Sequence, residues 1–273
     1  MKSFIKWAGG KKSISQAIIS KFPEVFDVYV EPFLGGGAVF LEVVKKYPEK
    51  EFILNDCNRI LINTWVHIKE NPDALMGLLD ALKEIYEQSP TKKNYEDLRG
   101  RFNDLTDRTI LKSAMFILLN KICYNGLWRV NSSGKFNTPW GNYEKCPSLY
   151  TSQALKTLSE YLKHVDIFSR DYRDVPFPKG ERTLIYLDPP YFDGFTGYVP
   201  NGFTIQRLKE LILWVDGLSK QGCKVIISHS AKDYGRIEAL FTGYNIDTVN
   251  VSRSINSDGL GRGKVREILI TNY

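Results

Sequence analysis

The sequence has little of the chemistry that builds metal centres and disulfide frameworks. Its 273 residues include three histidines without metal-ligand spacing, and four cysteines that form no CxxC pair: Cys57, Cys123, Cys146 and Cys223. Closely paired thiols are the usual sign of a zinc site or a disulfide scaffold. We therefore expect free thiols, as in a reducing cytoplasm, and no metal site.

Long apolar runs are also absent. No stretch approaches the roughly 20 residues that a helix needs to cross a bilayer, and no hydrophobic segment of a secretory signal precedes the first charges and glycines. Internal repeats and low-complexity linkers are missing as well. With 43% hydrophobic and 13% aromatic residues, we expect a globular protein with a large core and no membrane partner.

The net charge of +6 is unevenly distributed. Residues 91–145 contain ten Lys or Arg and five Asp or Glu. The same segment carries several aromatic residues: Tyr124, Trp128, Phe136, Trp140 and Tyr143. This mixture suits a nucleic-acid surface, because cations meet phosphates and rings stack on bases. The alternative is a solvated charged face above buried aromatic side chains.

Two parts of the chain follow the alternating rhythm of an α/β sheet. Strands are predicted at 27–30 and 52–55, with a glycine turn at 35–37 and a helix at 38–46 between them. Later strands are predicted at 165–168, 183–187, 223–228, 245–251 and 265–271, with a helix at 204–219. We therefore assign residues 1–58 and 160–273 to one α/β domain.

Residues 59–159 interrupt this rhythm. Helices are predicted to begin near Asn58 and to cover 72–86, 95–102 and 109–123. A β-hairpin is predicted near 124–141, where residues 128–131 and 135–137 flank a Ser-Ser-Gly turn. The segment is thus predicted to be a basic, mainly helical domain inserted into the α/β domain.

The glycine turn suggests a nucleotide-like ligand without a pyrophosphate. Gly35, Gly36 and Gly37 should leave backbone amides open to a ligand. The third glycine of the dinucleotide fingerprint is replaced by Phe40, which suits a ligand such as the amino-acid end of S-adenosylmethionine. Asp56 follows Gly35 by 21 residues and could bind ribose hydroxyls, or it could cap the next helix.

Asp188-Pro189-Pro190-Tyr191 is the most informative motif. It follows the predicted strand 183–187, and ligand chemistry in open α/β sheets concentrates at such strand ends. Asp188 and the carbonyl after it could accept both hydrogens of a planar exocyclic amine while Tyr191 stacks on its ring. The alternative is a proline turn in which Asp188 is a cap and Tyr191 belongs to the core.

The segment 6–12 combines basic residues, glycines and a tryptophan. Trp7 could wall a cofactor pocket while Lys6 or Lys11 reaches a carboxylate or nucleic acid. A basic loop with a docked tryptophan is the alternative.

Six motifs together resemble the Dam-type DNA adenine N6-methyltransferases of the D12 class, which methylate adenine in GATC and related sites. The motifs occur in that family's order and span most of the chain: 4–11, 31–37, 54–56, 124–131, 135–141 and 188–191. The resemblance implies a Rossmann-like methyltransferase sheet with an inserted target-recognition domain. It also implies S-adenosylmethionine as cofactor, bound in a pocket lined by Trp7, Lys11, Phe33, Gly35, Gly37, Asp56, Asp171, Tyr172 and Asp188.

The same resemblance implies a double-stranded DNA partner and a flipped adenine held by residues 188–191. Tyr124 and Asn125 would enter the duplex and fill the vacated space. Arg129 would contact a guanine, Leu127 and Pro139 the thymine, and Lys6 the other guanine, with Tyr143 also on the DNA surface. We expect a monomer acting on DNA in the cytoplasm of a bacterial or phage-infected cell, with a restriction endonuclease as a candidate partner.

One departure from the family pattern is the segment after Tyr191, which is several residues shorter than in familiar members. Alternatives to adenine in GATC are a longer site containing GAT, cytosine N4, adenine in RNA, or a glutamine amide. A DNA-binding module without catalysis is opposed by intact Asp188, Gly35 and Asp56. A nicotinamide oxidoreductase is opposed by the missing third glycine.

Overall fold

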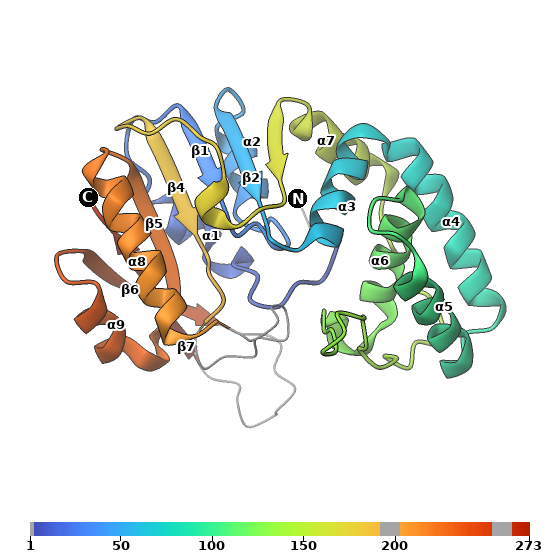
Figure 1. The fold of residues 1–273 in the computed structure, drawn as a ribbon. Helices are drawn as coiled ribbons and strands as arrows, with labels where there is room; N and C mark the ends of the chain where they lie inside the picture. Colours follow the sequence, from blue (N-terminus) through green and yellow to red (C-terminus); the bar gives the residue numbers. More distant parts are fainter. Residues whose placement is uncertain (1–2, 192–202, 253–263) are drawn as a thin grey trace.

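The computed structural model describes residues 3–191, 203–252 and 264–273. Its centre is a seven-stranded sheet in the order β3-β2-β1-β4-β5-β7-β6 (Figure 1). The strands are β1 (Val28–Glu31), β2 (Glu51–Asn55), β3 (Val165–Phe168), β4 (Thr183–Leu187), β5 (Lys224–Ser230), β6 (Asn245–Ser252) and β7 (Lys264–Thr271). All pairs are parallel except those of β7, which runs antiparallel to β5 and β6. Every predicted strand is confirmed.

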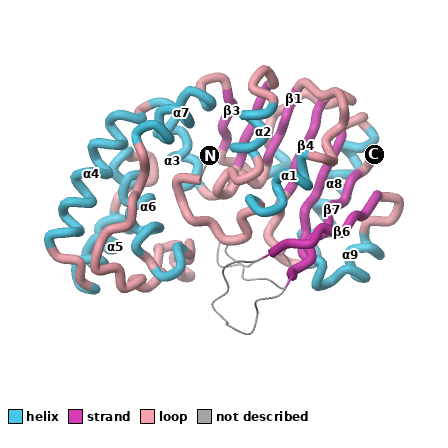
Figure 2. Tube along the Cα trace, turned by 180° about the vertical axis from the view of Figure 1, so that it is seen from behind, coloured by secondary structure: helices cyan, strands magenta, loops and turns pink. Residues whose placement is uncertain are grey.

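The sheet is covered on both faces, as its continuous apolar strands require. Every residue of β4 is buried, which is typical of a parallel strand between two helical layers. Alternate residues face two separate cores: Tyr186 packs with α2 (Phe40–Lys46), and Ile185 packs with α8 (Ile205–Lys220) and α9 (Tyr234–Leu240). Figure 1 shows α8 over one face, and Figure 2 shows the short α1 (Ser15–Ile19) and α2 over the other.

The predicted helical insertion lies between β2 and β3. It contains α3 (Arg59–Glu70), α4 (Pro72–Gln88), α5 (Lys92–Asp104), α6 (Ile110–Ile122) and α7 (Ser152–Leu162). Helix α6 is buried over nearly its whole length, because its neighbours α3, α4 and α5 pack around it. Helix α7 was missing from the sequence prediction, although its start is marked by Thr151, whose side chain accepts a hydrogen bond from the amide of Ala154.

The insertion shares its core with the sheet. One cluster of buried side chains runs from the helices of the insertion to β1, β2 and β4, and α3 contacts both α6 and β3. The predicted domain boundary at residue 160 falls inside α7. The described chain therefore has no flexible linker at that position, and the two parts are held together by a continuous apolar interface.

The predicted hairpin is present in a less regular form than expected. Two isolated antiparallel bridges, Cys123 with Trp140 and Val130 with Phe136, connect its arms. Asn131 fastens the turn, because its side-chain oxygen accepts hydrogen bonds from the amides of Ser133 and Lys135. Within the described residues, no helix is long and apolar enough to cross a membrane, and no His, Cys, Asp and Glu cluster could hold a metal.

Candidate active site and DNA-binding surface

Parallel pairing brings the predicted motifs to one edge of the sheet. Val30 of β1 lies opposite both Ile53 of β2 and Ile185 of β4, so these three strands end side by side. The glycine turn, Asp56 and Asp188 follow those strand ends directly. This is the edge at which open α/β sheets bind ligands.

Asp188 accepts hydrogen bonds from two side chains. Lys11 Nζ lies 2.8 Å from Oδ1 and 2.9 Å from Oδ2, and the lysine is held in place by the carbonyl of Gly9 at 2.8 Å. Ser228 Oγ of β5 lies 2.9 Å from Oδ1, and it is also 2.9 Å from the hydroxyl of Tyr186. Lys11 is 5% exposed, so this ion pair is screened little by water.

The ring of Tyr191 is held by β7 and β5. Its hydroxyl donates to Glu267 Oε2 at 2.6 Å, and its ring centroid lies 4.9 Å from that of His229. Lys11 Nζ sits 5.0 Å from the same centroid. Tyr191 is therefore a fixed ring beside the Asp188 carboxylate, while Pro189 is buried and Pro190 is half-buried.

The glycines at 35 and 37 serve packing and backbone conformation, and the expectation that their amides are open is wrong. Gly35 N–H donates to Asp56 Oδ2 at 2.9 Å, and Gly37 N–H donates to the carbonyl of Leu34 at 2.8 Å. Their φ angles are +51° and +65°. A Cβ at Gly35 would lie 2.8 Å from Trp7 Nε1, and one at Gly37 would lie 2.6 Å from Trp65. Trp7 thus lies against the turn at Gly35.

Asp56 orients two backbone segments. Besides accepting from Gly35, its Oδ1 accepts from the amide of Asn58 at 2.9 Å. The side chain that caps α3 is Asn58, which accepts from the amide of Leu61 at 3.2 Å. Burial raises the pKa of Asp56. A carboxylate offers about four lone-pair sites, so Asp56 can hold the turn and still accept from hydroxyl groups.

Phe33 and Tyr172 form an aromatic pair beyond the ends of β1 and β3. Their ring centroids are 5.3 Å apart, and Trp214 of α8 packs edge-on against Tyr172 at 5.0 Å. Asp171 is bound by Arg173 through Nε at 2.8 Å and Nη2 at 3.0 Å, and this hydrogen bonding lowers the pKa of Asp171. The predicted cofactor residues at 33 and 172 are therefore in contact, with Asp171 beside them.

Three polar residues of this edge were missed by sequence reasoning: Glu31, Ser228 and Glu267. Glu31 is 2% exposed, and Tyr29 donates to its Oε2 at 2.6 Å. Burial raises the pKa of Glu31 to about 8, and the nearby Asp188 adds to this rise. Ser228 and Glu267 lie within predicted strands and carried no signal of their own. Glu31 could have been singled out as the acid next to Pro32 at the end of β1.

Lys6 and Tyr143, both predicted to contact DNA, touch each other. Lys6 Nζ lies 3.0 Å from the Tyr143 hydroxyl and 5.2 Å from its ring centroid. The backbone of Lys6 is clamped to α6, because Asn120 accepts from its amide at 2.7 Å and donates to its carbonyl at 2.8 Å. The N-terminal segment is thereby joined to the inserted domain.

The remaining predicted DNA contacts gather around the hairpin. Tyr124 is 51% exposed, and the exposed Asn125 next to it has a φ of +53°. Tyr124 N–H donates to the carbonyl of Pro139 at 2.9 Å, and the half-buried Leu127 follows the same short turn. Arg129 is bound to Asn137 across the hairpin. The segment after Tyr191 that departs from the family pattern falls at 192–202, outside the described residues.

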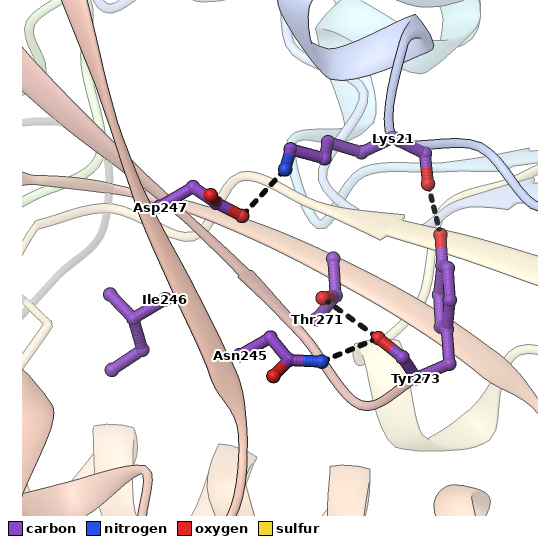
Figure 3. Close-up of a pocket in the computed structure, with 6 residues that line it drawn as sticks. All are labelled: Lys21, Asn245, Ile246, Asp247, Thr271 and Tyr273. Atoms are coloured by element: carbon purple, nitrogen blue, oxygen red, sulfur yellow. Dashed lines mark hydrogen bonds and ion pairs between the residues drawn. The ribbon is translucent and has the colours of Figure 1, made fainter.

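The cavity shown in Figure 3 is unrelated to this site. It measures about 340 Å³ and is lined by Lys21, Asn245, Ile246, Asp247, Thr271 and Tyr273. Thr271 pairs with Ile226 near the start of β5, whereas Asp188 follows the end of the parallel neighbour β4. The cavity therefore lies at the opposite edge of the sheet.

The strand order with its antiparallel β7, together with the Asp-Pro-Pro-Tyr motif at the end of β4, defines a Rossmann-like methyltransferase. The family of D12 class N6 adenine-specific DNA methyltransferases matches residues 7–255, and the chain belongs to this family. It is an adenine-specific DNA methyltransferase, as the resemblance predicted.

Similar proteins extend over the whole chain. The Type II methyltransferase M.MjaIII of Methanocaldococcus jannaschii is 35% identical over 291 residues, covering 100% of this chain and 99% of that protein. The DNA adenine methylase of Vibrio cholerae is 32% identical over 274 residues, covering 98% and 95%. The DNA adenine methylase of Escherichia coli strain K12 is 30% identical over 274 residues, covering 98% and 94%.

Proposed function

We propose that the chain methylates N6 of an adenine flipped out of duplex DNA, within the sequence GATC, with S-adenosylmethionine as methyl donor. The observation that carries this proposal is the Asp188 carboxylate beside the fixed ring of Tyr191, at the end of β4 and next to the Asp56 turn. A flipped base needs an acceptor for its amine and a ring to stack on, and this edge supplies both.

The residues around the glycine turn fit the proposed cofactor. Asp56 has acceptor capacity for ribose hydroxyls, and the Phe33 and Tyr172 pair offers aromatic surface to a purine. Trp7 lies so close to Gly35 that a Cβ at this position would overlap its indole ring. When bound there, S-adenosylmethionine would supply an electrophilic methyl group.

Asp188 prepares the amine for attack. Its carboxylate and the Pro189 carbonyl accept the two N6 hydrogens, which directs the nitrogen lone pair out of conjugation with the ring. Lys11 contacts both oxygens of the carboxylate and Ser228 contacts Oδ1, so Oδ2 keeps a lone-pair site with which it can accept from the amine. Positioning of this kind supplies a large part of the rate enhancement in a displacement reaction.

The DNA contacts of the proposal come from one continuous surface. Tyr124 at the tip of its turn fills the space left by the base, and Lys6 with Tyr143 contacts one flank of the site. Arg129 reads a guanine, with Leu127 and Pro139 next to the thymine. The two relatives named DNA adenine methylase support this assignment. Action as a monomer and association with a restriction endonuclease remain predictions.

Asp188→Ala tests the proposal. We expect transfer of tritiated methyl groups to plasmid DNA to fall to background, while S-adenosylmethionine binding measured by calorimetry stays within a few-fold of wild type. Asp247→Ala, at the opposite edge of the sheet, is the matched control and should retain activity. Near-normal transfer by Asp188→Ala would refute the acceptor role.

The proposed recognition sequence has a separate test. Single-molecule sequencing of DNA from cells expressing the wild type gives the methylated sequence, and methylated sites without GATC would refute the proposed specificity.

A further inference from the structure

Asn137 makes three hydrogen bonds with Arg129, its neighbour across the hairpin. Asn137 N–H donates to the Arg129 carbonyl at 3.0 Å. In return, Arg129 Nε donates to Asn137 Oδ1 at 2.8 Å and Nη2 donates to the Asn137 carbonyl at 3.0 Å. Both side chains are half-buried. The guanidinium is therefore held before any DNA is bound.

Asn137 engages one edge of the guanidinium, and this decides where the other edge points. A guanidinium has five N–H groups in a rigid plane, one on Nε and two on each Nη. With Nε and Nη2 turned to Asn137, the remaining N–H groups of Nη1 and Nη2 form a fork at the end of the side chain. Such a fork matches the O6 and N7 acceptors of guanine in the major groove.

The frame behind Asn137 is firmly packed. Trp128 and Phe136, which precede Arg129 and Asn137 in sequence, stack with ring centroids 4.9 Å apart. Asn103 of α5 clamps Phe136 by accepting from its amide at 2.8 Å and donating to its carbonyl at 3.0 Å. A contact built on a rigid frame keeps its geometry, and less freedom is lost when DNA binds.

We propose that Asn137 is a positioning residue for sequence recognition, whose side-chain oxygen holds Arg129 with its fork directed at a guanine. This rests on the proposed function, in which Arg129 reads that guanine. Arginine has many rotamers, and an unheld guanidinium could donate to phosphates or other bases as well. Asn137 thus sharpens discrimination at one base pair and does not take part in methyl transfer.

The test compares Asn137→Ala with Asn137→Asp. Each duplex carries the mapped methylation site, and in each one a single guanine is either kept or replaced by 7-deazaguanine, which lacks the N7 acceptor. For each guanine, the measured quantity is kcat/KM with guanine divided by kcat/KM with 7-deazaguanine. In Asn137→Ala we expect this ratio to fall about tenfold at one position, which corresponds to about 1.4 kcal/mol. Asn137→Asp keeps an acceptor for Nε and should restore the ratio, even if its charge weakens binding to all duplexes.

Asn103→Ala is the matched control, because it loosens the same hairpin without touching Arg129. It should lower kcat/KM for both duplexes equally and leave their ratio unchanged. The inference is overturned if Asn137→Ala keeps the wild-type ratio, if Asp does not restore it, or if Asn103→Ala lowers it equally. Arg129→Ala distinguishes a failure of this inference from a failure of the proposed function. If the ratio is unchanged in Arg129→Ala, Arg129 does not read a guanine.

Discussion

At the residue scale, the most consequential contact is the pair of Lys11 and Asp188. The sequence predicted a ligand role for both, but 177 residues separate them and nothing in their spacing indicated that they meet. The structure shows that the lysine forms an ion pair with the Asp188 carboxylate. A charge that is buried next to a reactive group must be compensated, because an unpaired buried carboxylate is costly.

A double-mutant cycle measures this pair. We expect Lys11→Met and Asp188→Asn each to lower the free energy of unfolding, and the double variant to lose less than their sum, with a coupling of about 1–3 kcal/mol. Urea denaturation of all four proteins gives the value. Lys21 and Asp247 form the control pair: they are 2.7 Å apart, but their side chains are 38% and 46% exposed. Exposed pairs couple by about 1 kcal/mol or less. Equal coupling in the two pairs would contradict a special role for burial.

At the element scale, periodicity predicted the strands and most helices, because each buries a continuous face against a neighbour. Helix α7 was missed because the sequence prediction assigned the hairpin near 124–141 and no element between it and the strand at 165–168. The site could be predicted as motifs at strand ends. The side chains that bind those motifs could not, since Ser228 and Glu267 look like ordinary strand residues until β5 is placed beside β4 and β7 beside β5.

Replacing glycine by alanine should change the stability of the protein in opposite directions in the glycine turn and in helix α4. Gly37→Ala should destabilise the protein by about 2 kcal/mol or more, because its φ is +65° and a Cβ would overlap Trp65. Gly77→Ala, in the exposed middle of α4 with open space at Cβ, should stabilise it by about 0.5–1 kcal/mol. Thermal unfolding of both variants checks this. Destabilisation of similar size at both positions would contradict the assigned cause.

At the scale of the whole molecule, the site joins parts that are distant in sequence. Lys11 comes from the N-terminal segment, Asp188 from the end of β4 and Glu267 from β7, while the residues proposed to contact DNA are Lys6 and residues of the insertion. The shared core fixes these parts relative to one another. Motif order could predict the family, but the meeting of these distant residues depends on the strand order, which places β7 beside β5, the neighbour of β4.

The buried acid beneath this site makes the stability of the whole protein depend on pH. Burial raises the pKa of Glu31 from 4.5 to about 8, so the folded protein keeps a proton that the unfolded chain releases. Where the folded state binds more protons, the free energy of unfolding falls as pH rises. The contribution of Glu31 is therefore complete below about pH 4.5 and is lost progressively up to about pH 8.

Glu31→Gln removes this titration while keeping an acceptor for Tyr29. Relative to this variant, the wild type should lose up to about 1.4 kcal/mol of stability per pH unit between pH 5.5 and 7.5. Urea denaturation in buffers of equal ionic strength gives the difference at each pH. Glu51→Gln, at the exposed start of β2, is the control and should follow the wild type. A constant difference between Glu31→Gln and wild type across this range would show that Glu31 is already ionised in the folded protein. Its buried charge would then have to be balanced by hydrogen bonds such as the one from Tyr29.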